Sequence, residues 1–217
     1  MQLLPLPLPL LLLTSILSVT VKAELRIVSV NEFIKFKDDV NGGTNYSGTT
    51  VLLDSDLSLN GKTFESIGNS KSKYFCGTFD GQGHVISNLV INSSSSEYIV
   101  LFGYSSGLSI RNAILDSSCS ITSLCKGSNN AYGGVAGYCL ANNAPCTIEN
   151  SVNMGSLSFT GNLSGSYSLY LGDIAGRIES YIHYSVVESC ANYGLSHTLE
   201  QAQVHALEAF LDVHIRL

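Results

Sequence analysis

The sequence predicts an all-β fold, a β-solenoid with a short N-terminal capping helix. Charged residues make up 13% of the 217 residues, well below the roughly 25% that is usual in globular proteins, which disfavours coiled coils and long solvated helices. Hydrophobic residues make up 45%, so the chain can bury a core and is not expected to be disordered. An internal repeat supplies the third observation, because its units are too poor in apolar residues to form separate cores.

The first 23 residues form a predicted signal peptide. An uncharged apolar run extends from Leu10 to Val21, and small or apolar residues then place a cleavage site after Ala23. The alternative is an uncleaved membrane anchor, since Met1 to Val21 carries no charge and nearly matches a bilayer of about 30 Å. Three prolines interrupt this segment and favour cleavage: Pro5, Pro7 and Pro9. No later stretch of sequence has the length and apolarity of a transmembrane span.

The elements after the leader begin with a short strand and a helix. Leu25 to Val28 is strand-like, and Ser29 with Glu32 has the spacing of a capping box at a helix start. Apolar residues then recur at helical spacing until Asn41, Gly42 and Gly43 end the helix. From Thr50 onward apolar and polar residues alternate with a period of two, which is typical of short strands.

An internal repeat organises the rest of the chain. Each unit contains an Ile or Val followed by two polar residues, at residues 86–88, 110–112, 148–150 and 187–189. An apolar pair followed by Gly precedes the last three of these, at residues 100–104, 134–138 and 173–177. Stacking such units buries a shared core, which predicts the solenoid. A β-sandwich with Gly-rich turns is the alternative, because it also has short, regularly spaced strands.

Residues 25–195 resemble GLUG-motif proteins, and the stretch at residues 77–84, GTFDGQGH, is the most specific part of the resemblance. The segments 134–155 and 172–194 look like two further GLUG repeats. The resemblance implies a right-handed parallel β-helix of the pectin-lyase-like kind over residues 24–198 and a secreted or surface setting. It implies no activity, because the motif is a structural repeat.

The C-terminal segment departs from this pattern. Residues 199–217 contain no Gly, Ser or Asn, and apolar residues recur at helical spacing after Thr198 and Gln201, which have capping-box spacing. The segment is either a C-terminal cap helix, which would cover the open end of the stack, or an atypical tail.

Six cysteines predict disulfides in an oxidising compartment. Cys119 with Cys125 and Cys139 with Cys146 would each close a short loop, while Cys76 and Cys190 form either a long-range bridge or free buried thiols. No CxxC spacing indicates zinc, and no other metal or cofactor is expected. Three sequons mark candidate glycosylation sites: Asn45, Asn92 and Asn162.

The candidate catalytic residues have structural interpretations. The adjacent pair Asp38 and Asp39 falls at the predicted helix end, where carboxylates are usually solvated. Asp54 and Asp56 are two apart, which suits calcium or a turn, and a turn is favoured because no further oxygen ligands cluster nearby. In the GLUG pattern Asp80 occupies a tight corner and is expected to accept backbone hydrogen bonds. The remaining candidates are His84, which lacks ligand spacing, and Arg111, the one Arg in a repeat tripeptide.

The expected function is a non-catalytic extracellular or cell-surface scaffold, adhesin-like, that binds glycans, matrix or another cell. Tyrosines suit such a surface because their rings are amphipathic: Tyr46, Tyr74, Tyr98, Tyr104, Tyr132 and Tyr138, although several of them are candidates for the core. The alternative is a carbohydrate-active β-helix enzyme, a polysaccharide lyase or hydrolase. The net charge of −6 offers no basic surface for nucleic acid, which is not an expected partner.

Overall fold

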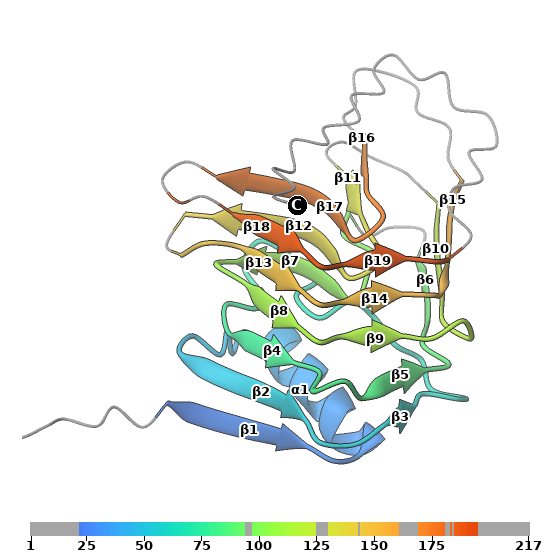
Figure 1. The fold of residues 1–217 in the computed structure, drawn as a ribbon, viewed down its shortest axis with the longest axis horizontal. Helices are drawn as coiled ribbons and strands as arrows, with labels where there is room; N and C mark the ends of the chain where they lie inside the picture. The colour runs from blue at the N-terminus through green and yellow to red at the C-terminus, as the bar shows by residue number, and fades with distance from the viewer. Residues whose placement is uncertain are drawn as a thin grey trace, which may run out of the picture.

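The computed structural model describes residues 22–93, 97–124, 130–142, 144–160, 169–180, 183 and 185–194. Its strands lie in parallel layers, with β1 at one end and β18 and β19 at the other (Figure 1). Residues 1–21 of the predicted leader and the predicted C-terminal cap helix at 199–217 lie outside the described residues, whereas the last two leader residues, Lys22 and Ala23, are described and Ala23 begins β1. Within the described part, no helix has the length and apolarity needed to cross a membrane.

The N-terminal helix follows the predicted sequence signals. Strand β1 (Ala23–Ile27) leads to α1 (Val30–Gly42), and the Oγ of the N-cap residue Ser29 accepts a hydrogen bond from the Glu32 N–H at 3.3 Å. The Glu32 carboxylate in turn accepts hydrogen bonds from the Ser29 hydroxyl at 3.1 Å and from the Val28 N–H at 2.9 Å, so the reciprocal backbone bond of this capping box comes from the residue before the N-cap. Gly43 ends the helix at φ 112°, a left-handed conformation that glycine adopts without steric cost. The predicted helix and both of its ends are confirmed.

The strands form five separate sheets, and every strand pair within them is parallel. The largest has the order β1-β2-β4-β8-β13-β18: β2 (Thr49–Leu53), β4 (Thr78–Asp80), β8 (Ser109–Arg111), β13 (Thr147–Glu149) and β18 (Val186–Glu188). The second has five strands: β3 (Leu57–Ser58), β5 (Val85–Ser87), β9 (Ile114–Leu115), β14 (Val152–Asn153) and β19 (Ala191–Asn192).

Three smaller sheets complete the described strands. One contains β6 (Val90–Ser93), β10 (Ser120–Leu124) and β15 (Ser156–Thr160). Another contains β7 (Phe102–Ser106), β12 (Ala136–Ala141) and β17 (Ala175–Ser180). The last pairs β11 (Asn130–Tyr132) with β16 (Leu169–Leu171). The chain visits these sheets in turn, so strands far apart in sequence lie side by side.

The prediction of one right-handed parallel β-helix is wrong: the described chain forms several small parallel sheets and one helix. Left-handed residues at the strand ends help to separate the sheets: Asn112, Asn150 and Ser189, which follow β8, β13 and β18, have φ of 55°, 48° and 53°. Such residues turn the chain sharply and interrupt the ladder. The repeats also differ in length, from 26 residues between the partners Ala23 and Thr49 to 39 between Thr147 and Val186.

Three of the four predicted tripeptides stack in register. Ile110 pairs with Ile148, and Ile148 with Val187, in the six-stranded sheet. The prediction is wrong for the first tripeptide, because Ile86 pairs with Leu57 and Leu115 in the five-stranded sheet. The residue in register with Ile110 is Phe79, whose larger side chain fills the same position in the core.

The glycines of the second repeat motif are required by close packing. Phe102 pairs with Ala136, and Ala136 with Ala175, so the three motifs lie side by side. A Cβ atom at Gly137 would lie 2.8 Å from the Gly103 carbonyl oxygen, and one at Gly103 would lie 2.5 Å from the Gly68 oxygen. These distances are shorter than a carbon atom tolerates, so the motif is a structural requirement of the stack.

Candidate functional site

The outer side of the six-stranded sheet carries a column of charged residues, here called the charged face: Asp80, Arg111, Glu149 and Glu188, which pair in register. Each follows a residue of the inner column, where Phe79, Ile110 and Ile148 are fully buried. Because successive side chains of a strand point to opposite sides, burial of the inner column turns the charged residues outward. The Arg111 side chain is 47% exposed.

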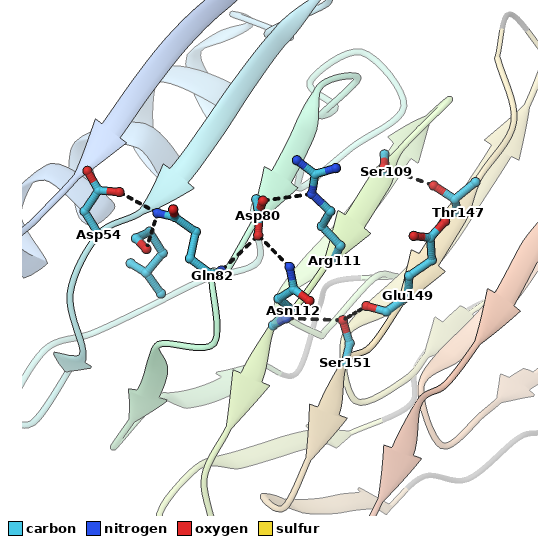
Figure 2. Close-up of polar contacts among 11 residues, drawn as sticks. Asp54, Asp80, Gln82, Ser109, Arg111, Asn112, Thr147, Glu149 and Ser151 are labelled. Carbon is cyan, nitrogen blue, oxygen red and sulfur yellow. Dashed lines mark hydrogen bonds and ion pairs between the residues drawn. The ribbon is translucent and has the colours of Figure 1, made fainter.

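Asp80 is the centre of a hydrogen-bond network on this face (Figure 2). Its Oδ2 accepts a hydrogen bond from Arg111 Nε at 2.8 Å, and its Oδ1 accepts from Asn112 Nδ2 and the Gln82 N–H, both at 2.9 Å. Burial by itself raises the pKa of Asp80, but the bonds from Asn112, Gln82 and Arg111 outweigh it and hold the pKa below its usual value. Asp80 is therefore ionised. The bond from the Gln82 N–H is a backbone hydrogen bond of the kind that the sequence predicts for Asp80.

Arg111 lies between two carboxylates in this column. It pairs with Asp80 on β4 and lies opposite Glu149 on β13. Beside it, Thr147 Oγ1 donates a hydrogen bond to Ser109 Oγ at 3.0 Å, which places hydroxyl groups next to the charges (Figure 2). The face thus presents both hydrogen-bond donors and acceptors along one side of the sheet.

Asp54 and Asp56 flank the turn between β2 and β3, as predicted, and contact different partners. Arg26 Nη1 donates to Asp54 at 2.8 Å, and the Gln82 side-chain amide donates to its other oxygen. Asp56 accepts the Val85 N–H at 2.9 Å and lies 3.1 Å from His84 Nδ1. The bond from Arg26 lowers the pKa of Asp54, and the bond from Val85 lowers the pKa of Asp56.

The acidic pair at the helix end divides into two environments. Asp38 is exposed and forms an ion pair with Lys37 at 2.7 Å. Asp39 accepts hydrogen bonds from Lys35 Nζ at 2.6 Å and from the Tyr46 hydroxyl at 3.0 Å, and the Lys35 bond lowers its pKa. Burial and the bond to Asp39 raise the pKa of Tyr46 to about 12. Asp39 therefore holds Tyr46, in the segment after the helix, against the helix end. The predicted solvated carboxylate at the helix end is Asp38 alone.

Tyrosines gather in a second cluster, separate from the main core and mostly buried, here called the tyrosine face: Tyr74, Tyr98, Tyr104, Tyr138, Arg177 and Glu179. Tyr104, Tyr138 and Arg177 are in register on β7, β12 and β17. The Tyr104 and Tyr138 rings stack with centroids 4.9 Å apart, and the Arg177 guanidinium carbon lies 5.3 Å from the Tyr138 centroid. Such contacts stabilise the face through ring stacking and cation–π attraction.

An ion pair borders the tyrosine face. Arg177 Nη2 lies 2.8 Å from Glu179 Oε2, and the Tyr138 hydroxyl donates a hydrogen bond to the same carboxylate. Burial, and then the bond to Glu179, raise the pKa of Tyr138, so its hydroxyl stays protonated. The other nominated tyrosines belong elsewhere: Tyr132 is fully buried, and Tyr46 packs against Phe36 and Phe75.

Four of these tyrosines are among those that the sequence predicts for a binding surface, whereas Arg177 and Glu179 are not. A signal for them was present, because Tyr104, Tyr138 and Arg177 each follow the glycine of the second repeat motif. The register of that motif is sufficient to place the three side chains in one column.

One of the two predicted short disulfides is present, between Cys139 and Cys146, with Cα atoms 6.3 Å apart. Cys119 is a free, buried thiol whose Sγ lies 3.2 Å from the Ile86 carbonyl oxygen, and burial raises its pKa to about 11. Its predicted partner Cys125 lies outside the described residues. Cys76 and Cys190, left open by the sequence, are free thiols.

The sequons and histidines add no catalytic or metal-binding cluster to the described structure. Asn45 is half-buried and its Oδ1 accepts the Ser47 N–H, Asn92 is exposed on β6, and Asn162 lies outside the described residues. Among the described residues, no three His, Cys, Asp or Glu side chains are placed to hold a metal ion.

Comparison with known proteins defines the fold only. No family model matches the chain, and no curated protein matches it. A solved structure of a candidate immunoglobulin A1 protease from Bacteroides ovatus is similar, with a TM-score of 0.51 and 18% identity. The match covers 79% of this chain and 57% of that one. Sequence identity at this level shows a shared fold and transfers no activity.

Proposed function

We propose that this protein is a non-catalytic extracellular or cell-surface scaffold that binds glycans, matrix or another cell through its outer faces. The observation that carries the proposal is the state of Asp80. This buried carboxylate is held ionised by three hydrogen bonds from the fold, whereas a general acid needs a raised pKa and a proton to give. Asp54 and Asp56 are likewise engaged in bonds that lower their pKa values.

The proposed location rests on the predicted leader and the Cys139–Cys146 disulfide. Disulfides persist in oxidising compartments, such as the outside of the cell.

A carbohydrate-active enzyme is the second candidate, favoured by one specific observation. Asp80 Oδ2 lies 2.8 Å from Arg111 Nε on the outer side of the six-stranded sheet. Glu149 is the register partner of the same Arg on the neighbouring strand. A carboxylate beside an Arg is a combination that can stabilise charge in a reaction on a sugar polymer.

The experiment that separates the two candidates is incubation of the purified chain with acidic and neutral polysaccharides, with and without calcium. The scaffold proposal predicts retention on at least one glycan or on a cell surface, without products. Chain cleavage that disappears in Asp80→Asn or Arg111→Ala, but persists in Asp56→Asn, would establish the enzyme instead. Asp56 is a suitable control because its carboxylate is exposed and lies on a turn outside the charged column.

A further inference from the structure

Asn-Gly and Asp-Gly dipeptides can undergo a spontaneous change of the main chain, and the sequence contains three of them, at residues 41–42, 60–61 and 80–81. In each, the backbone nitrogen of the glycine can attack the side-chain carbonyl carbon of the residue before it and close a succinimide ring. Glycine favours this attack because it has no side chain to obstruct it and the most flexible backbone. The rate then depends on how firmly the fold holds the side chain and the glycine N–H.

Two of the three dipeptides are held by hydrogen bonds. Asn41 is half-buried in α1; its Oδ1 accepts the Gly68 N–H at 2.9 Å, and its Nδ2 donates to a further backbone carbonyl at 3.0 Å. Asp80 is bound by the network of the charged face, and the Gly81 N–H donates to the Arg111 carbonyl oxygen at 2.8 Å. Ring closure at either dipeptide first requires these bonds to break.

The third dipeptide lies in an exposed turn directly after β3. The Lys62 N–H donates to the Leu59 carbonyl oxygen at 2.9 Å, and Gly61 has a φ of 68°, as in a type II turn. Asn60 and Gly61 are both exposed, and even a Cβ atom at Gly61 would meet nothing within 4 Å. Within the described part of the chain, neither the Asn60 side chain nor the Gly61 N–H has a hydrogen-bond partner. The nucleophile and the carbon that it attacks are therefore both unrestrained and open to water.

We propose that Asn60 is a site of spontaneous deamidation in the folded protein, whereas Asn41 is protected by its place in the fold. The Gly61 nitrogen forms a bond to Cγ of Asn60, the bond from Cγ to the side-chain nitrogen breaks, and that nitrogen takes the Gly61 proton and leaves as ammonia. Water then hydrolyses the succinimide at either carbonyl, which gives aspartate or isoaspartate at position 60. The inference is independent of the proposed function.

The modification changes the turn but leaves the sheet before it in place. Both products carry a carboxylate at neutral pH, and isoaspartate also adds a methylene group to the main chain. β3 is an edge strand of its sheet, so the new charge lies at the edge. Leu59 is fully buried and its N–H donates to the Ser87 carbonyl oxygen at 2.9 Å, which anchors the chain before the turn. We therefore expect the deamidated chain to stay folded.

The test is incubation of the full chain at mildly alkaline pH, followed by proteolysis at acidic pH and mass spectrometry of the peptides that contain Asn41 and Asn60. Deamidation exchanges an amide for a carboxyl group, and chromatography separates the aspartate and isoaspartate forms. In the folded chain, we expect Asn60 to convert about tenfold faster than Asn41 or more, because the bonds that hold Asn41 suppress its local opening.

Two controls isolate the contribution of the fold. In guanidinium chloride the chain is unfolded, and Asn41 and Asn60 should convert at similar rates because each precedes a glycine. Asn60→Gln should abolish conversion at position 60 and leave Asn41 unchanged, because the longer side chain closes a less favourable ring. Should Asn60→Gln not fold, Asn60→Ser is the same control.

Three outcomes would overturn the proposal. Equal conversion of Asn41 and Asn60 in the folded chain would show that the fold does not protect Asn41. Conversion of Asn60 in denaturant alone would show that the turn restrains it. If neither residue converts even in denaturant, the susceptibility assigned to these dipeptides is wrong for this chain.

Discussion

Replacing Ile110 by Asp tests whether the inner column holds the stack together. Ile110 is fully buried between its register partners Phe79 and Ile148. Loss of the Ile side chain costs about 2–5 kcal/mol by comparison with similar core truncations. Burying the new carboxyl group in its neutral form costs a further 4 kcal/mol or so at pH 7, because about three pKa units separate that pH from the ordinary Asp value. The combined cost is comparable to the roughly 5–15 kcal/mol that stabilises a typical domain.

The assay is thermal unfolding followed by circular dichroism at pH 7 and pH 4, with Ile110→Asn as the isosteric control. The folded state raises the pKa of the new Asp, so its proton is bound more tightly when folded, and the variant gains stability as the pH falls toward 4. We expect Ile110→Asp to be unfolded at pH 7 and to recover up to about 4 kcal/mol relative to Ile110→Asn at pH 4. A cooperative transition with the wild-type midpoint at pH 7 would refute the inward placement of Ile110.

Four further predictions concern the Cys139–Cys146 disulfide, the close-packed glycine Gly137, the charged residue Asp80 and the left-handed residue Ser189. Peptide mapping without reductant should recover Cys139 joined to Cys146, and recovery of both as free thiols would contradict the structure. Gly137→Ala should destabilise the chain by about 1–3 kcal/mol or more in chemical denaturation, whereas Gly42→Ala, with no atom near the new Cβ, should not. Asp80→Asn should cost about 1.5–3 kcal/mol at pH 7; because the folded state lowers the pKa of Asp80, this difference should shrink as the pH falls below about 4, and a difference independent of pH would count against an ionised Asp80. Ser189→Asn should raise stability by up to about 1 kcal/mol, because Asn adopts the left-handed φ of 53° more readily than Ser, and an unchanged midpoint would show that this corner is not strained.

Local features of the fold could be predicted because their causes are local. The capping box of Ser29 and Glu32 depends on atoms within four residues, and the structure contains it. The disulfide between Cys139 and Cys146 closes a separation of seven residues, so spacing alone suggests it. The turn positions of Asp54 and Asp56 similarly follow from the residues that flank them.

The register of the sheets could not be predicted from spacing alone. The tripeptide at residues 86–88 has the same residue types as the later ones, because any sharp corner favours an apolar residue followed by polar ones and Asn. Asn88 has a φ of 54°, almost the same as the 55° of Asn112, yet the two residues follow strands of different sheets. Similar corners therefore recur more than once per repeat, and sequence similarity does not say which of them stack.

The charged and tyrosine faces were difficult to predict for the opposite reason. Inner positions must be apolar at every level of the stack, so Phe79, Ile110 and Ile148 share a recognisable pattern. Outer positions have no such requirement, and one outer column can change from Tyr138 to Arg177 between neighbouring strands.

Folding tolerates this variation because outer side chains contribute less to the core than inner ones. The glycines of the second repeat motif separate two clusters: Phe102 belongs to the main core, Gly103 follows, and Tyr104 lies in the smaller buried cluster with Tyr98. Regular alternation would place Phe102 and Tyr104 on the same side of the strand, yet the two rings belong to different clusters, so the alternation is interrupted near Gly103. The structural repeat thus provides the geometry of the tyrosine face, while the residue after each glycine determines its chemistry.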